Sequence, residues 1–456
     1  MIVNNREKNK LFYKTMLSIA VPVTLQNLIS SSLNMIDIFM ITKLGDANIA
    51  AVGQANQVFF LFAIILFGIS SGSSIFIAQF WGKRDRKSIK SVLGIAIFSG
   101  TILSAVFTLA SLLMPEAIMK ILINDPEVIA LGAKYLRIVC ISYIFTSVTF
   151  AFSGACRSVR QANLPLFVSV VSIAINTFLN YALIFGKFGF PEMAIEGAAT
   201  ATVIARIVEC LLLVFIIYKG KGQNVLRAKW SELTDITMKF VKKFFKTTSP
   251  VIMNEAMWSL GMVMYSIAYA TLGKEATAAV QISVTIQNIF MVFAFGLAGA
   301  CATMIGNKIG EGDEEEGIRY AKKFAVIGVV LGIALAILLY FSAPFILKLF
   351  SADKALFETS KKILKTLAFF IPFKLFTALV IVGIFRGGGD TKYSMLLEIG
   401  CVWLVGVPLA FISALVFKFP VYYVVAFAYS EEIVKSFLCI PRIVSKKWIK
   451  NVVDDV

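Results

Sequence analysis

Carboxylate and carboxamide side chains that interrupt long apolar stretches are the groups of this chain best suited to chemistry. Gln26, Asn34 and Asp37 fall on one stripe of a helix, and Asn176 and Asn180 stand one helical turn apart further along the chain. A carboxylate and amide oxygens together form a hard, oxygen-only site suited to sodium, and the same amides would also hydrogen-bond a protonated carboxyl group. We therefore predict a cation-coupling site at Asp37, Asn176 and Asn180, with Asp37 as the ligand of a sodium ion or the carrier of a proton.

Each of these groups also has a purely structural interpretation. Asp37 would contact water or a lysine if it lay at the outer end of its helix, and the two asparagines would hydrogen-bond between helices, as asparagine commonly does in membranes. In either case the stripe of Gln26, Ser30, Asn34 and Asp37 faces a cavity or partner helices, because so polar a surface cannot face lipid. Gln26 and Asn34 are therefore candidates for lining a substrate site.

Several kinds of chemistry are excluded by what the chain lacks. Histidine is absent from all 456 residues, which excludes Ser-His and Cys-His nucleophile pairs and histidine-ligated zinc. The six cysteines show no CxxC spacing and are interpreted as small apolar packing residues. Neither a GxxxxGKS/T loop nor an HExxH motif occurs. We therefore expect neither an enzyme nor a cofactor, and any proton handling would fall to carboxylates.

The elements that must position these groups are membrane-spanning helices. Hydrophobic residues make up 58% of the chain and charged residues only 16%, which excludes a soluble protein of this size. A membrane helix needs about 20 consecutive apolar residues. The prediction is an all-α integral membrane protein with twelve transmembrane helices, at 15–40, 50–80, 91–113, 130–153, 164–186, 195–218, 247–271, 277–306, 324–347, 366–385, 394–416 and 420–440.

The basic residues indicate the orientation of these helices. Lys and Arg outnumber Asp and Glu by 44 to 27, which gives a formal net charge of +17. Most of the basic residues fall at the two ends of the chain and in the alternate loops 81–92, 154–163, 219–246, 308–323 and 386–393. Cytoplasmic loops carry such an excess, so both termini are predicted to be cytoplasmic. The charge is thereby explained, and we expect no nucleic acid partner.

An internal repeat divides the chain into two halves. A shift of 228 residues superimposes Pro22 on Pro250 and Gly82 on Gly310, with many matches between them. We predict an N-terminal six-helix lobe over 1–220, a basic cytoplasmic linker over 221–246 and a C-terminal six-helix lobe over 247–456. Because six is an even number, both lobes enter the membrane from the same side and are related by a pseudo-two-fold axis along the membrane normal. Two such lobes around a central cavity are typical of an alternating-access transporter.

The repeat also points to candidate residues in the second half. Glu255 superimposes on Asn27, and Tyr265 takes the place of Asp37. Glu255 is a second carboxylate that would bind a proton or a cationic substrate. Tyr265 is a further candidate for a substrate or second-cation site. Pro22 and Pro250 fall at equivalent places in the first helix of each half, where each proline would let the helix bend during transport, or would be a tolerated kink.

Further ionisable residues lie inside the predicted spans. Arg206 and Glu209 are spaced i,i+3 on one helix and are predicted to neutralise one another. Lys374 and Glu398 are candidates for cavity linings or distant partners. The run 387–390, GGGD in sequence, is interpreted as a tight cytoplasmic turn.

Five segments together resemble the MATE (multidrug and toxic compound extrusion) family, and the resemblance covers essentially the whole chain. They read NMIDIFMITKLGDANIAAVG at 34–53, GACRSVRQANLP at 154–165, NTFLNYALIFG at 176–186, AIEGAATATVIAR at 194–206 and FRGGGDTKYSM at 385–395. The family's N-lobe cation site carries over onto Asp37, Asn176 and Asn180. Some relatives have a second Asp where this chain has Asn180, and others an Asp in the tenth helix, which this chain lacks.

The resemblance implies a secondary antiporter that exports organic cations or drugs in exchange for inward sodium or protons. The substrates would be hydrophobic or cationic small molecules, and the protein would be a multi-pass monomer of the bacterial cytoplasmic (inner) membrane. The alternative is a lipid-linked precursor flippase of the same wider superfamily, which would need a strongly basic cavity where only Arg206 and Lys374 are available. A membrane enzyme is the alternative from a different class, and no nucleophile-base pair or metal cluster supports it.

Overall fold

The structure is a computed structural model that describes residues 5–220, 224–350 and 353–454, without the side chains of 5, 32–36, 38, 349 and 350. These residues are almost entirely helical, and an isolated bridge between Gly389 and Ile449 supplies β-type pairing. The helices are α1 (Asn5–Thr42), α2 (Asp46–Gly82), α3 (Arg86–Leu113), α4 (Pro115–Leu122), α5 (Pro126–Val139), α6 (Ser142–Ser158), α7 (Asn163–Ile184), α8 (Ala194–Lys219), α9 (Trp230–Thr234), α10 (Met238–Ala270), α11 (Lys274–Gly310), α12 (Glu314–Phe350), α13 (Lys354–Ala378), α14 (Thr391–Cys401), α15 (Val407–Phe411) and α16 (Val421–Val444), with π-helical segments η1 (Leu379–Phe385), η2 (Val402–Gly406) and η3 (Ile412–Val416).

The helices account for the twelve predicted spans. Among the described residues, eight helical segments are long and apolar enough to cross a membrane, and the bent pair α5 and α6 forms a ninth. The remaining long helices α1, α10 and α16 carry more polar or charged residues and coincide with the predicted spans at 15–40, 247–271 and 420–440. The predicted fold class is therefore confirmed.

The span predicted over 130–153 is bent by 52° between α5 and α6. No proline or glycine lies at the bend. Instead, the Thr108 hydroxyl donates a 3.0 Å hydrogen bond to the carbonyl of Cys140, and the Ser142 hydroxyl donates one of 2.6 Å to the carbonyl of Val139. Hydroxyl groups that insert into a helical ladder in this way bend the helix, which hydropathy alone does not show.

Two compact units make up the fold. The N-unit contains Leu25–Ile77 and Asp85–Phe245, and the C-unit contains Met1–Thr24, Ala78–Arg84 and Lys246–Val456. Helix α1, the first helix of the N-terminal half, thus begins in the C-unit, and α10, the first helix of the C-terminal half, begins in the N-unit. Pro22 lies inside α1 just before this change of unit, and Pro250 lies inside α10 just after it.

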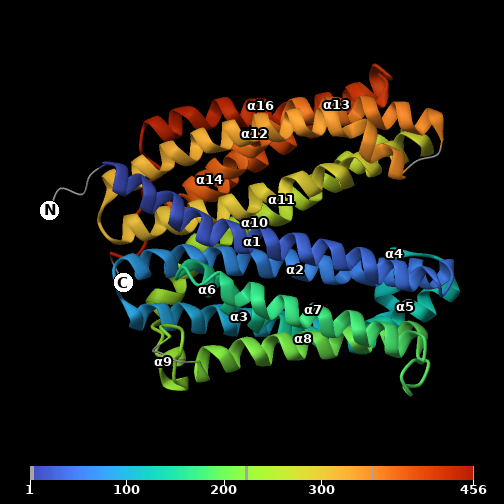
Figure 1. The fold of residues 1–456 in the computed structure, drawn as a ribbon, viewed down its shortest axis with the longest axis horizontal. Coiled ribbons are helices and arrows are strands. Elements are labelled where there is room, and N and C mark those ends of the chain that lie inside the picture. The colour runs from blue at the N-terminus through green and yellow to red at the C-terminus, as the bar shows by residue number, and fades with distance from the viewer. Residues whose placement is uncertain (1–4, 221–223, 351–352, 455–456) are drawn as a thin grey trace. The chain divides into compact units, whose positions relative to one another are not determined.

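The N-unit is held by small residues that let helices approach closely. Helices α7 and α8 run side by side (Figure 1), and a Cβ atom at Gly197 of α8 would lie 2.8 Å from the carbonyl oxygen of Leu183 in α7. A buried cluster that includes Ile41, Leu136 and Ile184 joins α1, α5 and α7. In membranes, where lipid is as apolar as leucine, such close backbone packing is a main source of helix association.

The C-unit contains a larger buried cluster that packs α10, α11, α12, α13 and α16 against one another. It includes Leu339 of α12, Leu364 of α13 and Val424 of α16. Helices α12 and α13 lie side by side in it (Figure 1). The first part of α1 packs in the same unit, where the Phe12 ring meets the Phe324 ring edge-on at 5.1 Å. A Cβ atom at Gly296 of α11 would lie 2.7 Å from the carbonyl oxygen of Ala20.

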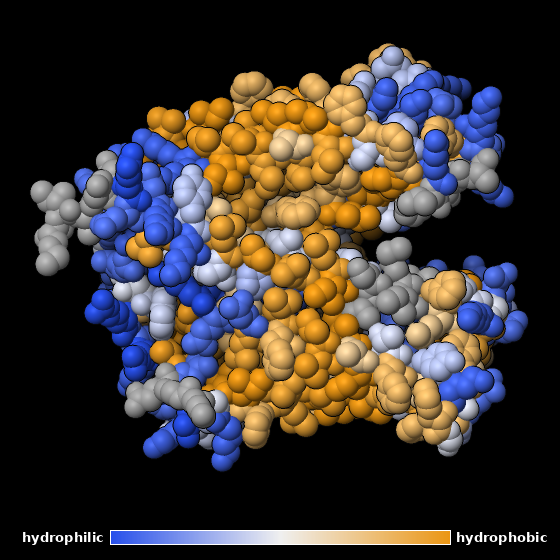
Figure 2. Space-filling view, viewed as in Figure 1, coloured by the Kyte–Doolittle hydropathy of each residue, from blue (hydrophilic) through white to orange (hydrophobic). Residues whose placement is uncertain are grey.

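The outer surface of each unit matches a bilayer. In Figure 2 apolar side chains gather over the middle of the helices, and hydrophilic side chains gather at the helix ends. Large apolar side chains such as Leu404 (79% exposed) and Phe345 (71%) point outward. A surface of this kind would aggregate in water, whereas it satisfies the hydrocarbon of a membrane.

Candidate functional site

The N-unit brings Asp37 of α1 together with both asparagines of α7. The side-chain amide of Asn180 donates a 2.6 Å hydrogen bond from Nδ2 to Asp37 Oδ1 and another of 3.2 Å to Asn176 Oδ1. Asn180 is 2% exposed, whereas Asp37 is partly exposed. Three polar side chains from two helices therefore form one connected group at the place the sequence predicted.

The hydrogen bonds of Asn180 show which states of Asp37 the group can accommodate. Asn180 acts as a donor toward Asp37, which suits an ionised carboxylate, since hydrogen bonds to charged acceptors are the stronger ones. The other amide atom, Asn180 Oδ1, is buried and has no hydrogen-bond partner among the described residues. Turning the amide by about 180° would exchange the two atoms and present an oxygen to a bound cation. The donor set therefore fits either a proton on Asp37 or a sodium ion between Asp37 and the amide oxygens.

A second polar chain begins about three turns earlier on α1. Gln26 Nε2 donates to the Ser169 hydroxyl at 2.8 Å, and this hydroxyl donates to Glu209 Oε1 at 3.1 Å. Arg206 Nη1 donates to Glu209 Oε2 at 2.9 Å, which confirms the predicted i,i+3 pair. Gln26 is thereby held by α7 rather than free in a cavity, and the chain ends on the charged pair of α8.

In the C-unit, the predicted residue Glu255 is ion-paired. Its Oε1 lies 2.6 Å from Arg386 Nη1, and the Arg386 side chain is 2% exposed. Arg386 Nη2 also lies 3.7 Å from Glu398 Oε2, and that oxygen accepts a 2.7 Å hydrogen bond from Asn254 Nδ2. Glu255 thus belongs to a four-residue network in which Arg386 already occupies the place of a cation.

The glycine turn that follows η1 positions a fully buried carboxylate. Gly389 has φ +89°, a conformation that glycine adopts without strain. The adjacent Asp390 accepts hydrogen bonds from Arg442 Nε at 2.8 Å and Nη2 at 2.6 Å, and from Lys450 Nζ at 2.6 Å. The predicted turn is confirmed, and its acidic end holds the end of α16 and the chain that follows.

A third charged cluster was missed by the sequence reasoning. Glu431, Glu432 and Lys435 of α16 are 3%, 6% and 2% exposed, and Lys435 Nζ lies 3.3 Å from Glu431 Oε1 and 3.2 Å from Glu432 Oε1. The predicted residue Tyr265 of α10 lies at this cluster, with its hydroxyl beside Glu431 Oε2. The signal in the sequence was three charges at i, i+1 and i+4 within the apolar span 420–440.

The two predicted prolines, Pro22 and Pro250, both lie inside continuous helices. The side chain of Asn34 falls outside the described residues, so its predicted role stays a prediction.

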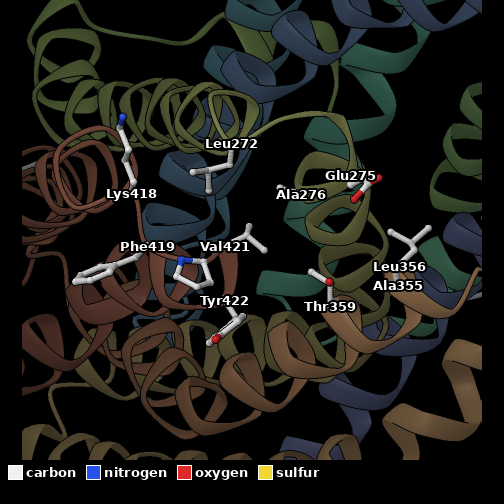
Figure 3. A pocket seen from close by; sticks show the side chains of 11 residues that line it. Leu272, Glu275, Ala276, Ala355, Leu356, Thr359, Lys418, Phe419, Val421 and Tyr422 are labelled. Carbon is white, nitrogen blue, oxygen red and sulfur yellow. The ribbon is translucent and has the colours of Figure 1, made fainter.

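A hollow of about 380 Å³ lies at one end of the C-unit, and the predicted site residues are not among those that line it. It is formed by the turn between α10 and α11, the start of α13 and the chain that leads into α16. Figure 3 shows Lys418 and Glu275 on opposite sides of it, with Leu272 between them. Phe419 and Tyr422 also line the hollow.

Comparison with known proteins shows which family has this arrangement. The model of the MatE family matches residues 22–182 and 250–412, one match in each half of the repeat. The chain belongs to the MatE family. Each match begins within the proline-containing first helix of its half. The first covers Asp37, Asn176 and Asn180, and the second covers Glu255 and Arg386.

Curated relatives and solved structures of this family resemble the chain over nearly its full length. It is 26% identical to the probable multidrug resistance protein NorM of Thermotoga maritima, over 96% of this chain and 94% of that protein. It is 25% identical to the probable multidrug resistance protein YoeA of Bacillus subtilis, over 90% and 89%. A MOP superfamily transporter from Pyrococcus furiosus has the same fold, with a TM-score of 0.87, 19% identity, and 96% and 97% of the two chains covered.

Proposed function

We propose that this MatE family member is a secondary antiporter, which exports organic cations or other drugs in exchange for inward sodium or protons by alternating access. The observation that carries the proposal is the Asp37 carboxylate, which accepts a hydrogen bond from Asn180 inside an apolar helix bundle. A membrane-embedded carboxylate with neutral donors around it is the kind of group that exchanges a cation. The names of the curated multidrug resistance relatives support the drug substrates.

In the proposed cycle, Asp37 alternates between a charged and a neutralised state. A cation that arrives from outside neutralises the carboxylate and weakens its hydrogen bond from Asn180, because charge-assisted hydrogen bonds are about twice as strong as neutral ones. The part of α1 that carries Asp37 is then free to rearrange near Pro22, and the drug is released. Discharge of the cation to the cytoplasm restores the bond and allows substrate to rebind.

The membrane potential is sufficient to drive this exchange when each cycle moves one net charge inward. One elementary charge that crosses 100 mV contributes about 2.3 kcal/mol. Since about 1.4 kcal/mol corresponds to a tenfold change in equilibrium constant, one net inward charge per cycle supports roughly fiftyfold accumulation. For a neutral drug, one cation carried by Asp37 supplies that net charge. Exchange of one cation for a monovalent organic cation moves no net charge, and the concentration gradient of the coupling cation alone drives it.

We further propose that the protein lies in the bacterial inner membrane as a monomer, with both termini in the cytoplasm. The basic ends and alternate loops support this orientation, because cytoplasmic segments carry the excess of Lys and Arg. We keep 1–220 and 247–456 as the two homologous lobes, with 221–246 as the linker. The second carboxylate, Glu255, is proposed to act through its pair with Arg386, which a cationic substrate would have to displace.

The alternative lipid-linked flippase is not favoured by the geometry of the basic residues it would need. Arg206 is already paired with Glu209, and the Lys374 ammonium lies 4.9 Å from the centre of the Tyr429 ring. Neither group is available to bind a pyrophosphate.

The test of the antiport is accumulation of ethidium in everted membrane vesicles, with sodium and pH gradients imposed separately. We expect Asp37→Asn to abolish gradient-driven accumulation, because asparagine cannot change charge. Asp46→Asn is the matched control, since Asp46 is exposed at the start of α2 and its loss removes the same charge. Full coupled accumulation by Asp37→Asn would exclude the proposed role, and the gradient that drives the wild type identifies the ion.

A further inference from the structure

The cluster on α16 contains a carboxylate whose hydrogen bonds are incomplete. Glu432 is satisfied on both oxygens, because Thr377 donates a 2.6 Å hydrogen bond to Oε2 and Lys435 lies 3.2 Å from Oε1. Glu431 has Lys435 at 3.3 Å from Oε1. Its Oε2 is buried, and the Tyr265 hydroxyl lies near it. Neither Glu431 Oε2 nor the Tyr265 hydroxyl has a hydrogen-bond partner among the described residues.

The space between these two oxygens is made by a glycine. A Cβ atom at Gly406, in η2, would collide with the Tyr265 hydroxyl and would lie 3.0 Å from Glu431 Oε2. Tyr265 is 4% exposed, so its hydroxyl is sealed from bulk water and points into the acidic cluster. An unpartnered phenol and an unpartnered carboxylate oxygen therefore share one small polar space in an apolar interior.

The charges of the network around Glu431 do not balance. Glu431, Glu432 and Lys435 face Glu398 from α14 and Lys374 from α13, and Glu398 leads on to Arg386 and Glu255. Four carboxylates thus share three cations. The other side chains at the cluster, Tyr265 and Tyr269 from α10, Tyr429 from α16, and Cys401 and Cys439, carry no compensating charge in their neutral forms. A single proton would make this network neutral.

We propose that Glu431 is a second proton-binding site, which takes up and releases one proton against the Tyr265 hydroxyl. In the ionised state the phenol donates its O–H to Glu431 Oε2. In the protonated state the carboxyl O–H at Oε2 donates to the phenol oxygen, since a tyrosine hydroxyl both donates and accepts. The proton comes from hydronium and returns to water, and no other bond forms or breaks.

The repeat gives this site a counterpart in the N-unit. There the carboxylate Asp37 is on the first helix of the repeat, and its neutral hydrogen-bond partner Asn180 is on another helix. In the C-unit the neutral partner Tyr265 stands at the position of Asp37, and the carboxylate Glu431 is on α16. Each unit therefore places one exchangeable carboxyl group against one neutral partner. The first helix of the repeat carries the carboxyl group in the N-unit and the neutral partner in the C-unit.

Infrared difference spectroscopy of the purified full-length protein in lipid, recorded as the pH is changed, tests the proposal without a drug. Asp37→Asn is used as the background so that the other carboxyl group is silent. We expect a pH-dependent band of a protonated carboxyl group, its loss in Glu431→Gln, and its retention in the matched control Glu432→Gln. Addition of sodium at constant pH should leave the band unchanged.

Tyr265→Phe is the second variant, and it keeps every charge. We expect it to retain the carboxyl band at a shifted frequency, because the carboxyl group loses its hydrogen-bond partner. A band that survives Glu431→Gln, a band lost only in Glu432→Gln, or a band removed by sodium would each overturn the assignment. If Glu431→Gln does not fold, an unshifted carboxyl band in Tyr265→Phe would overturn the assignment. The antiport itself is judged by ethidium accumulation, so the two proposals can fail separately.

Discussion

The Asp390→Asn substitution should release the C-terminal segment that follows α16. Asp390 is 1% exposed and accepts three hydrogen bonds from Arg442 and Lys450. Lys450 is about half exposed, so water screens its contribution, and most of the effect comes from the buried pair with Arg442. Removing one partner of a buried ion pair costs about 3–5 kcal/mol, since the other charge is left uncompensated.

Other buried contacts also hold the segment 446–454 in place. The Trp448 side chain is 1% exposed, and Gln79 bridges the segment by donating to the carbonyl of Lys450 at 3.1 Å and accepting from the amide of Val452 at 2.8 Å. Hydrogen exchange measured by mass spectrometry on peptides that cover 446–454 reports its opening directly. A loss of about 3 kcal/mol corresponds to roughly a hundredfold faster exchange.

The control for this substitution is Asp454→Asn. Asp454 lies 3.8 Å from Lys83, and its side chain is 64% exposed, so it removes the same charge from the same segment without a buried partner. We expect its exchange to match the wild type. Equal protection of 446–454 in Asp390→Asn and the wild type would refute the reasoning, because it would mean that the buried pair does not hold the segment.

Three further predictions test other contacts. Gly197→Ala should lower the thermal stability by about 1–3 kcal/mol through the clash with α7, whereas Gly53→Ala, which meets nothing within 4 Å, should not. Glu232, whose pKa is lowered chiefly by its hydrogen bond from the Lys90 ammonium, should hold α9 at neutral pH and release it as the pH falls through that lowered pKa; unchanged exchange of 229–235 in acid would contradict this. Arg386→Met should lower the melting temperature strongly, and adding Glu255→Gln should restore part of it.

The sequence itself determined the membrane fold because a segment that crosses a bilayer must satisfy its backbone hydrogen bonds within itself. Each span must bury its own backbone hydrogen bonds in a helix of about 20 apolar residues, so composition alone located the twelve spans. The same requirement makes polar residues in a span conspicuous, which is why Asp37, Asn176 and Asn180 could be singled out before their distances were known. The repeat and the family resemblance also depend only on the order of residues along the chain.

The tertiary structure decided which polar groups are partners, because partners on different helices have no fixed spacing in the sequence. It paired Glu255 with Arg386, 131 residues away, and aimed Tyr265 at Glu431. It also assigned the first part of α1 to the C-unit, although α1 is one continuous helix. Helix periodicity states which residues share a face, and only packing states what that face meets. In the sequence Glu431 was one charge among others in a span, and only its buried oxygen beside a phenol gives it a role.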